Sequence, residues 1–315
     1  MFTMPPSLCL IIATFLWGSS FIALKYAIAI YDPAVVIFAR MLTTLLICLL
    51  LWRFVKRFDY QSGDWKYLVS MSLAEPCLYF LFEGHAMEYT SASQAGVLVS
   101  CLPIIVAVLA FYLLKEQLSK AIIIGFSLCI GGSILLTLVS PHSDQAPNPL
   151  LGNFLEFLAM ICAAYYTVSV KHLAARYSPL SLIALQGLSG SLFFAPFLFF
   201  VDLPTEINSS AIFSILYLGT FVTLGGYGLY NYAISKISVL TAAAFSNLIP
   251  IFALLLSAII LQEVLTLWQW LSIGVVFIGI LVSQQHAKQI KDNADPLGEL
   301  EHINTEEPVK SSSVV

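Results

Sequence analysis

Long apolar stretches follow one another along almost the whole chain, separated by short turns that hold charged residues, glycine, proline or asparagine. A helix needs about 20 apolar residues to cross the roughly 30 Å hydrocarbon core of a bilayer. The stretches reach this length, and they predict an all-α integral membrane protein with ten transmembrane helices. The predicted spans cover residues 7–30, 34–54, 66–87, 92–114, 121–140, 150–172, 179–200, 210–233, 238–261 and 267–286.

Basic residues occupy alternate turns between these spans, and this asymmetry predicts the orientation of the chain. They are Arg53, Lys56, Arg57, Lys66, Lys115, Lys120, Lys171, Arg176 and Lys236, with Lys288, Lys291 and Lys310 after the last span. The intervening turns hold acidic residues and His142, and Lys25 near the end of the first span is their only basic neighbour. Because basic residues in short loops stay in the cytoplasm during insertion, we expect both termini to be cytoplasmic.

Composition excludes a soluble protein and several classes of partner. The chain is 59% hydrophobic and only 10% charged, with a mean hydropathy of +0.89. It has no basic patch and no glycine-rich phosphate loop, so we expect no nucleic-acid partner and no nucleotide. The cysteines lie inside apolar stretches without metal-ligand spacing, which predicts neither disulfides nor a metal or other cofactor. The acidic, polar segment 287–315 is predicted to be a disordered cytoplasmic tail.

The two halves of the sequence repeat each other. Pro103 and Pro250 lie 147 positions apart, and so do Glu116 and Glu263. At the same offset Ser91, Ala95 and Gly132 match Ser238, Ala242 and Gly279, and at an offset of 146 Lys25 and Pro33 match Lys171 and Pro179. We therefore predict one repeat in residues 1–141 and a second in residues 142–286, each with five spans. An odd number of spans makes the repeats inverted, which favours an alternating-access carrier with a solute site between them.

Motifs in both repeats resemble a known transporter family. They are Trp17-Gly18-Ser19-Ser20-Phe21, Phe38-Ala39-Arg40, and the Leu-x-Glu-x-Leu-Ser/Thr endings that follow the prolines of spans four and nine. The chain resembles the drug/metabolite transporter superfamily, specifically its EamA-type ten-helix permeases. The resemblance implies a carrier in the inner membrane that commonly exports amino acids or related metabolites. It also implies a cavity between two four-helix halves, with the fifth span of each repeat as support.

Ionisable side chains inside the spans are candidates for function, because a charge at membrane depth is costly unless it is paired or faces water. Arg40 and Glu83 are expected at similar depth, where they either pair with each other or leave Arg40 free for a substrate carboxylate. Glu75 precedes Pro76, whose ring interrupts the helical hydrogen bonds. It either couples transport to protons or stays neutral as a hydrogen-bond donor. Lys25 and His85 are expected to extend to the membrane interface.

Aromatic and amide residues complete the predicted substrate cavity. Trp17 is expected near the membrane midplane, far from the interfacial positions that tryptophan prefers. The other candidates are Ser100, Tyr165, Tyr166, Thr167, Tyr227, Tyr230, Asn231, Tyr232 and Asn247. The alternative for each aromatic residue is helix packing. Glu116 and Glu263 are expected to be structural, and Thr266 with Gln269 has the spacing of a capping box.

Two other functional classes remain as alternatives to a carrier. A membrane-embedded enzyme needs a nucleophile with its base, paired catalytic carboxylates or a metal cluster, and no such motif is visible. A non-transporting receptor or scaffold would bind a solute without moving it. The expected partners are a small-molecule solute and the lipid bilayer, and the sequence is compatible with either a monomer or a homodimer.

Overall fold

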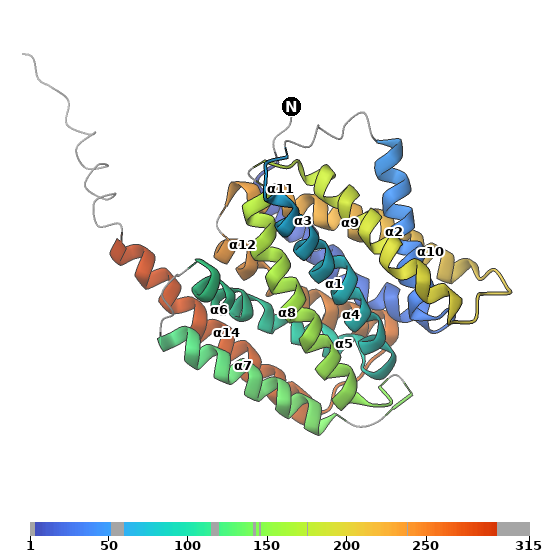
Figure 1. The fold of residues 1–315 in the computed structure, drawn as a ribbon. Coiled ribbons are helices and arrows are strands. Elements are labelled where there is room, and N and C mark those ends of the chain that lie inside the picture. Colours follow the sequence, from blue (N-terminus) through green and yellow to red (C-terminus); the bar gives the residue numbers. More distant parts are fainter. Residues whose placement is uncertain are drawn as a thin grey trace, which may run out of the picture.

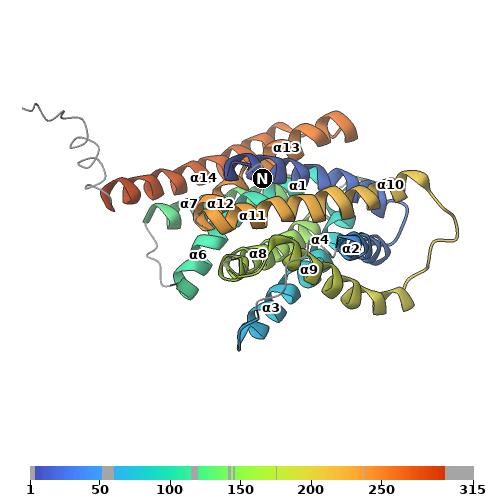
Figure 2. The same cartoon turned by 90° about the horizontal axis from the view of Figure 1, so that it is seen from above.

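The computed structural model describes residues 4–51, 60–114, 120–140, 143–144, 146–174, 176–237 and 239–294. These residues form a bundle of helices, and no strand longer than an isolated bridge occurs among them (Figures 1 and 2). Seven helical stretches in the described part are long and apolar enough to cross a membrane, and shorter apolar helices cover Ile123–Val139 and Leu267–Gly279. The predicted all-α membrane fold is confirmed.

Helices of the first repeat coincide with the first five predicted spans. They are α1 (Pro6–Ile28), α2 (Pro33–Leu50), the third span formed by α3 (Asp64–Ser72), η2 (Leu73–Leu78) and α4 (Tyr79–Tyr89), the fourth formed by α5 (Ala92–Leu98), η3 (Val99–Cys101) and α6 (Leu102–Leu114), and α7 (Lys120–Val139). Helix α2 begins where Pro33 fixes the first turn and the Asp32 carboxylate accepts a hydrogen bond of 2.8 Å from the Ala34 N–H.

Helices of the second repeat follow the same plan. They are α8 (Pro149–Leu173), the seventh span formed by α9 (Pro179–Phe194) and η4 (Ala195–Phe199), the eighth formed by α10 (Ser209–Tyr217), η5 (Leu218–Tyr227) and α11 (Gly228–Lys236), the ninth formed by α12 (Val239–Phe245), α13 (Leu248–Leu256) and η6 (Ser257–Leu261), and α14 (Leu267–Ala294). Ser178 and Pro179 begin α9 as Asp32 and Pro33 begin α2. The same signals therefore start the second span of each repeat.

The fifth span of each repeat packs against the other at one edge of the bundle, where α7 and α14 run side by side (Figures 1 and 2). Gly132 of α7 lies against Val276 of α14, and Gly279 of α14 lies against Cys129 of α7. Gly132 and Gly279 are repeat equivalents, and so are Cys129 and Val276. The contact is thus made twice, once in each direction, as an approximate two-fold axis between inverted repeats requires.

Equivalent lysines join the helices at the two ends of the bundle. The Lys25 ammonium donates hydrogen bonds to the backbone carbonyls of Met87 (2.6 Å) and Thr90 (2.7 Å), at the end of α4. Lys171 does the same at the end of α11, through the carbonyls of Ile234 (2.9 Å) and Ile237 (2.7 Å). Lys25 was expected to extend to the membrane interface. It instead neutralises the partial negative charge of a helix C-terminus.

Glu263 connects the repeats at the Lys25 end of the bundle. Its carboxylate accepts hydrogen bonds from the N–H groups of Ala92 (3.2 Å) and Ser93 (3.1 Å), so it caps the N-terminus of α5 from across the repeat boundary. Thr266 and Gln269 form the predicted capping box at the start of α14, with reciprocal bonds of 2.8 and 3.3 Å. The structural roles expected for these residues agree with this geometry.

Some predicted features lie outside the described residues. They include Arg53, Lys56, Arg57, Lys115, Glu116, His142, Ser238 and Lys310, and the tail from residue 295 onward. Helix α14 continues to Ala294, beyond the position at which the tail was expected to begin.

Candidate functional site

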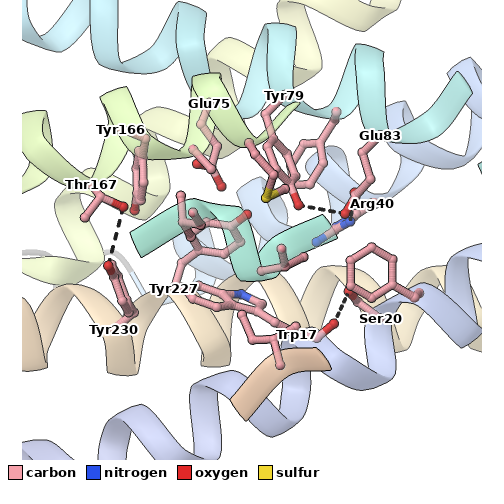
Figure 3. Close-up of a pocket in the computed structure, with 17 residues that line it drawn as sticks. Trp17, Ser20, Arg40, Glu75, Tyr79, Glu83, Tyr166, Thr167, Tyr227 and Tyr230 are labelled. Carbon is pink, nitrogen blue, oxygen red and sulfur yellow. Dashed lines mark hydrogen bonds and ion pairs between the residues drawn. The ribbon is translucent and has the colours of Figure 1, made fainter. Parts of the chain in front are cut away.

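A cavity lined by aromatic, ionisable and apolar residues of both repeats lies within the bundle (Figure 3). We call it the central cavity. Its polar and aromatic lining consists of Trp17, Ser20, Phe21, Arg40, Glu75, Tyr79, Phe80, Glu83, Tyr166, Thr167, Tyr227 and Tyr230. Spans one to four and spans six, eight and nine all contribute to the walls. The volume is only about 40 Å³, which is room for a few water molecules at about 10–15 Å³ each.

Interrupted helices create this polar space. In η2, Glu75 leaves the helical conformation (φ −146°, ψ 116°), and Pro76 has no N–H to donate. The freed Glu75 carbonyl accepts a long hydrogen bond of 3.5 Å from the Gln186 amide in α9. On the opposite wall, η5 is a widened segment of the equivalent span, and it carries Thr223 and Tyr227. The expected effect of Pro76 is thus present, and its partner segment in the second repeat has no proline.

Arg40 is held by contacts on three sides. Its side chain is 2% exposed, and its Nε donates a 2.8 Å hydrogen bond to the Thr223 hydroxyl. Its Nη1 lies 3.8 Å from Glu83 Oε2, and its guanidinium carbon lies 4.1 Å from the Phe80 ring centre. The Arg40–Glu83 pair considered from the sequence is therefore formed. At 3.8 Å this contact is too long for a hydrogen bond, and Nη1 has no other partner.

The two glutamates on the third span have different surroundings. Glu83 pairs with Arg40 and accepts a 2.7 Å hydrogen bond from the Tyr79 hydroxyl, one helical turn away. Glu75 is 3% exposed, and its carboxyl interacts electrostatically with Tyr227. No basic side chain forms a salt bridge with Glu75 among the described residues. Glu83 is therefore balanced by a positive charge, whereas Glu75 faces the central cavity beside aromatic groups.

Aromatic rings from both repeats form one wall. The Trp17 ring lies 5.1 Å from Tyr227 and 4.9 Å from Tyr230 between ring centres, and Tyr166 lies 5.8 Å from Tyr227. Trp17 is half-buried, and its Nε1 is shielded from solvent without a hydrogen-bond partner. Tyr230 donates a long 3.4 Å hydrogen bond to Thr167. Trp17 and tyrosines of spans six and eight, which were predicted to form one aromatic pocket, thus lie on the same wall.

Five of the residues predicted to form the cavity are absent from its lining, namely Ser100, Tyr165, Asn231, Tyr232 and Asn247. Asn231 is fully buried behind the wall, where it accepts a 2.8 Å hydrogen bond from the Tyr166 hydroxyl and so fixes that ring. Ser100 is buried with an unpartnered hydroxyl, and both polar atoms of the Asn247 side chain also lack partners. The remaining predicted residues lie together on the lining, and they are Trp17, Arg40, Glu75, Glu83, Tyr166, Thr167, Tyr227 and Tyr230.

Sequence reasoning missed Tyr79 and Glu156. Tyr79 precedes Glu83 by four positions, a spacing that places the two on the same face of a helix. Glu156 lies in α8, where it is 0% exposed and neither carboxyl oxygen has a hydrogen-bond partner. A carboxyl within the apolar stretch 150–172 carries the same signal that identified Glu75.

Comparisons with known proteins agree with this architecture. The model of the EamA-like transporter family matches residues 4–138 and again residues 150–284. The uncharacterized transporter YetK of Bacillus subtilis is 31% identical over 212 residues, which cover 65% of this chain and 63% of that protein. An uncharacterized transporter of Archaeoglobus fulgidus is 27% identical over 84% of this chain and 94% of its own length. A solved crystal structure shares the fold, with a TM-score of 0.68 at 16% identity over 90% of this chain and 98% of that one.

Proposed function

Because this chain belongs to the EamA-like transporter family and is a multi-pass membrane transporter, we propose that it exports an amino acid or a related metabolite by alternating access through the central cavity. The observation that carries this proposal is the set of unmatched polar groups on the lining. Among the described residues, Arg40 Nη1 and Trp17 Nε1 are donors without hydrogen-bond partners, and the Glu75 carboxyl has no salt bridge to a basic side chain.

These groups suit the two ends of an amino acid. A carboxylate can accept hydrogen bonds from the guanidinium of Arg40 and the indole N–H of Trp17. An ammonium can bind Glu75 and the faces of the surrounding aromatic rings. Glu75 is then the group that couples transport to protons, because a carboxyl that binds an ammonium ion gives up its proton. The aromatic wall accommodates the apolar part of the solute.

The small volume of the cavity supports a mechanism in which the helices move apart to admit the solute. A space of about 40 Å³ cannot hold a metabolite, so the helices must separate before a solute enters. Contacts related by the repeats, such as those of Lys25 and Lys171, offer two nearly equivalent ways of closing the bundle. Opening one end while the other stays closed exposes the cavity to one side at a time.

The positions of the basic residues support insertion into the cytoplasmic membrane with both termini in the cytoplasm. In this proposal the chain works as a carrier and has no enzymatic role. The second candidate is a receptor or scaffold that binds the solute without moving it. Solute movement in a purified system distinguishes the two functions.

Counterflow in proteoliposomes tests the proposal. Vesicles loaded with a mixture of unlabelled amino acids should accumulate the labelled substrate with saturable kinetics. We expect Trp17→Ala to weaken solute binding about thirtyfold, because loss of a central aromatic contact costs about 2 kcal/mol. Phe15→Ala is the matched control, since Phe15 lies on the same helix with 43% of its surface exposed.

Proton coupling needs a second comparison. Exchange should change between two pH values in the native protein and lose this response in Glu75→Gln. Equal exchange in the native protein, Trp17→Ala and Glu75→Gln would refute the assignment of the site. Saturable binding without counterflow of any tested solute would instead favour the receptor function.

A further inference from the structure

The charges around the central cavity do not balance. Arg40 is the only basic side chain among the described lining residues, and Glu83 offsets it across 3.8 Å. Glu75 adds a second carboxyl to the lining. An empty cavity therefore contains more acidic groups than basic groups, before any residue behind the lining is counted.

Glu156 supplies a third carboxyl next to this set. Met160 and Ala163 of α8 line the cavity, and Glu156 precedes them by four and seven positions, so it lies on the same helical face. Helix α8 packs along α4, and the carboxyl of Glu156 interacts electrostatically with Glu83 and Tyr79 on that helix. Its two oxygens are completely buried and have no hydrogen-bond partner in the part of the chain that the structure describes.

The titratable and charged groups that face Glu75 and Glu156 come from five surrounding elements. They are Arg40 of α2, Tyr79 and Glu83 of α4, Cys162 and Tyr166 of α8, Tyr227 of η5 and Tyr230 of α11. Arg40 is the only cation among them. Since a buried carboxylate needs a nearby positive charge or a proton, two such carboxyls can be balanced only by protons or by a cationic solute.

We propose that Glu75 and Glu156 make the central cavity selective for solutes with a net positive charge, namely amino acids with a basic side chain and related amines. This inference rests on the proposed carrier function and specifies its substrate class. Each excess positive charge of the solute replaces one carboxyl proton, which passes to water, and the exchange is electrically neutral. Trp17, Tyr227 and Tyr230 add ring faces suited to an ammonium group.

The test compares solutes of similar size and different charge. Proteoliposomes containing the native protein are offered free lysine, norleucine or glutamate, and a trapped pH indicator follows proton movement. We expect lysine to exchange about tenfold or more faster than norleucine, because the lost pairing of a buried charge is costly. One more proton should move per lysine than per norleucine, because lysine carries one additional ammonium group.

Glu156 is tested by two substitutions and a control. Glu156→Gln should abolish the preference for lysine and the additional proton moved with it, and Glu156→Asp should retain both. Glu206→Gln, in an exposed loop, removes a carboxyl of the same kind and should behave as the native protein. Lysine-dependent quenching of Trp17 fluorescence provides a binding assay, and size-exclusion chromatography identifies variants that misfold.

The outcomes separate the two proposals. Equal exchange of lysine and norleucine with equal proton movement would overturn the charge selectivity and leave the carrier function intact. Unchanged lysine selectivity in Glu156→Gln would remove Glu156 from the site. Binding without counterflow for every solute would overturn the carrier function itself.

Discussion

Asp64 joins the two repeats where the third span begins. Its carboxylate pairs with Arg176 and accepts hydrogen bonds from the Tyr177 hydroxyl (2.9 Å) and the Gln61 N–H (3.1 Å). Burial raises the pKa of Asp64, but these hydrogen bonds and the charge of Arg176 outweigh it, and the pKa lies below its ordinary value. Burial and the contact with Asp64 raise the pKa of Tyr177 to about 12.

This cluster predicts a stability that depends on pH. A carboxyl with a lowered pKa in the folded protein stabilises the fold above its unfolded pKa, and the effect is lost as pH falls through the folded pKa. We expect the Tm of the purified protein to decrease once the pH is lower than about 4. Tyr177→Phe removes one hydrogen bond to the carboxylate, so it should lower the Tm at neutral pH and reduce the further loss in acid.

Tyr31 offers a matched control for this measurement. It is the repeat equivalent of Tyr177, and its hydroxyl contacts the backbone of Glu206 and Asn208 instead of a carboxylate. Thermal unfolding in detergent between about pH 3 and pH 7 should show an altered acid profile for Tyr177→Phe and a native one for Tyr31→Phe. Identical profiles for the two variants would contradict the role of Asp64.

At the residue scale, the sequence indicates which side chains are costly in a membrane but not what they contact. Arg40, Glu75 and Glu83 were identifiable because charge within an apolar span needs compensation. The bonds of Lys25 to Met87 and Thr90 were not, because those carbonyls lie more than 60 positions away. Local spacing contains no information on such distant backbone groups.

Two glycines determine how closely α7 and α14 approach. A Cβ atom at Gly132 would lie 2.7 Å from a Val276 side-chain carbon and 2.9 Å from its backbone nitrogen. At Gly279 it would lie 2.8 Å from the Gly125 carbonyl oxygen and 2.9 Å from the Cys129 nitrogen. Backbone atoms cannot move aside as a flexible side chain can, so larger residues must push the helices apart.

We therefore predict that Gly132→Val destabilises the protein by about 1–3 kcal/mol, the usual cost of overpacking. Gly131→Val is the matched control, because a Cβ at this adjacent position meets no atom within 4 Å. Gly279→Val and Gly274→Val form the equivalent pair on α14. Unfolding midpoints in detergent should fall for the first member of each pair and remain near the native value for the second. Equal losses within a pair would show that β-branching in the helix, and not the helix contact, causes the effect.

At the element scale, span positions were predictable because hydrophobic length and helix-start signals are local. Interruptions within the spans were harder to predict from the sequence. Pro76 indicates the break in η2, because proline cannot donate a backbone hydrogen bond. The widening of η5 has no proline, and it occurs where Gly219 and Gly226 let the helix approach α2 and Trp17 closely. Such packing depends on elements that lie far apart in the sequence.

At the scale of the whole molecule, the two ends of the bundle are closed by contacts that both repeats make and by contacts that only one end has. Lys25 and Lys171 make the same pair of carbonyl contacts at opposite ends of the bundle. At the Lys25 end, the Glu263 carboxylate also accepts a hydrogen bond from the N-terminus of α5. At the other end, Asp64 forms a salt bridge with Arg176. The repeat in the sequence predicts the symmetric contacts in principle, whereas the Asp64 salt bridge depends on residues present in only one repeat.

Because Lys25 and Lys171 make equivalent contacts at opposite ends of the bundle, substituting them should have equal and opposite effects on transport. Lys25→Met removes two hydrogen bonds that hold one end closed, so it should favour the state open at that end. A net loss of about 1 kcal/mol corresponds to a shift of about fivefold between the two states. The apparent KM should then fall for solute added at the Lys25 end and rise for solute added at the other.

Lys171→Met should reverse both changes, because it loosens the opposite end. Proteoliposomes with a single protein orientation, assayed separately for uptake and efflux, measure the two KM values for each variant. Changes of opposite sign in the two variants are expected only if the inverted repeats open in alternation. Changes of the same sign would mean that these lysines stabilise the fold as a whole, and the alternating closure argued from their symmetry would be wrong.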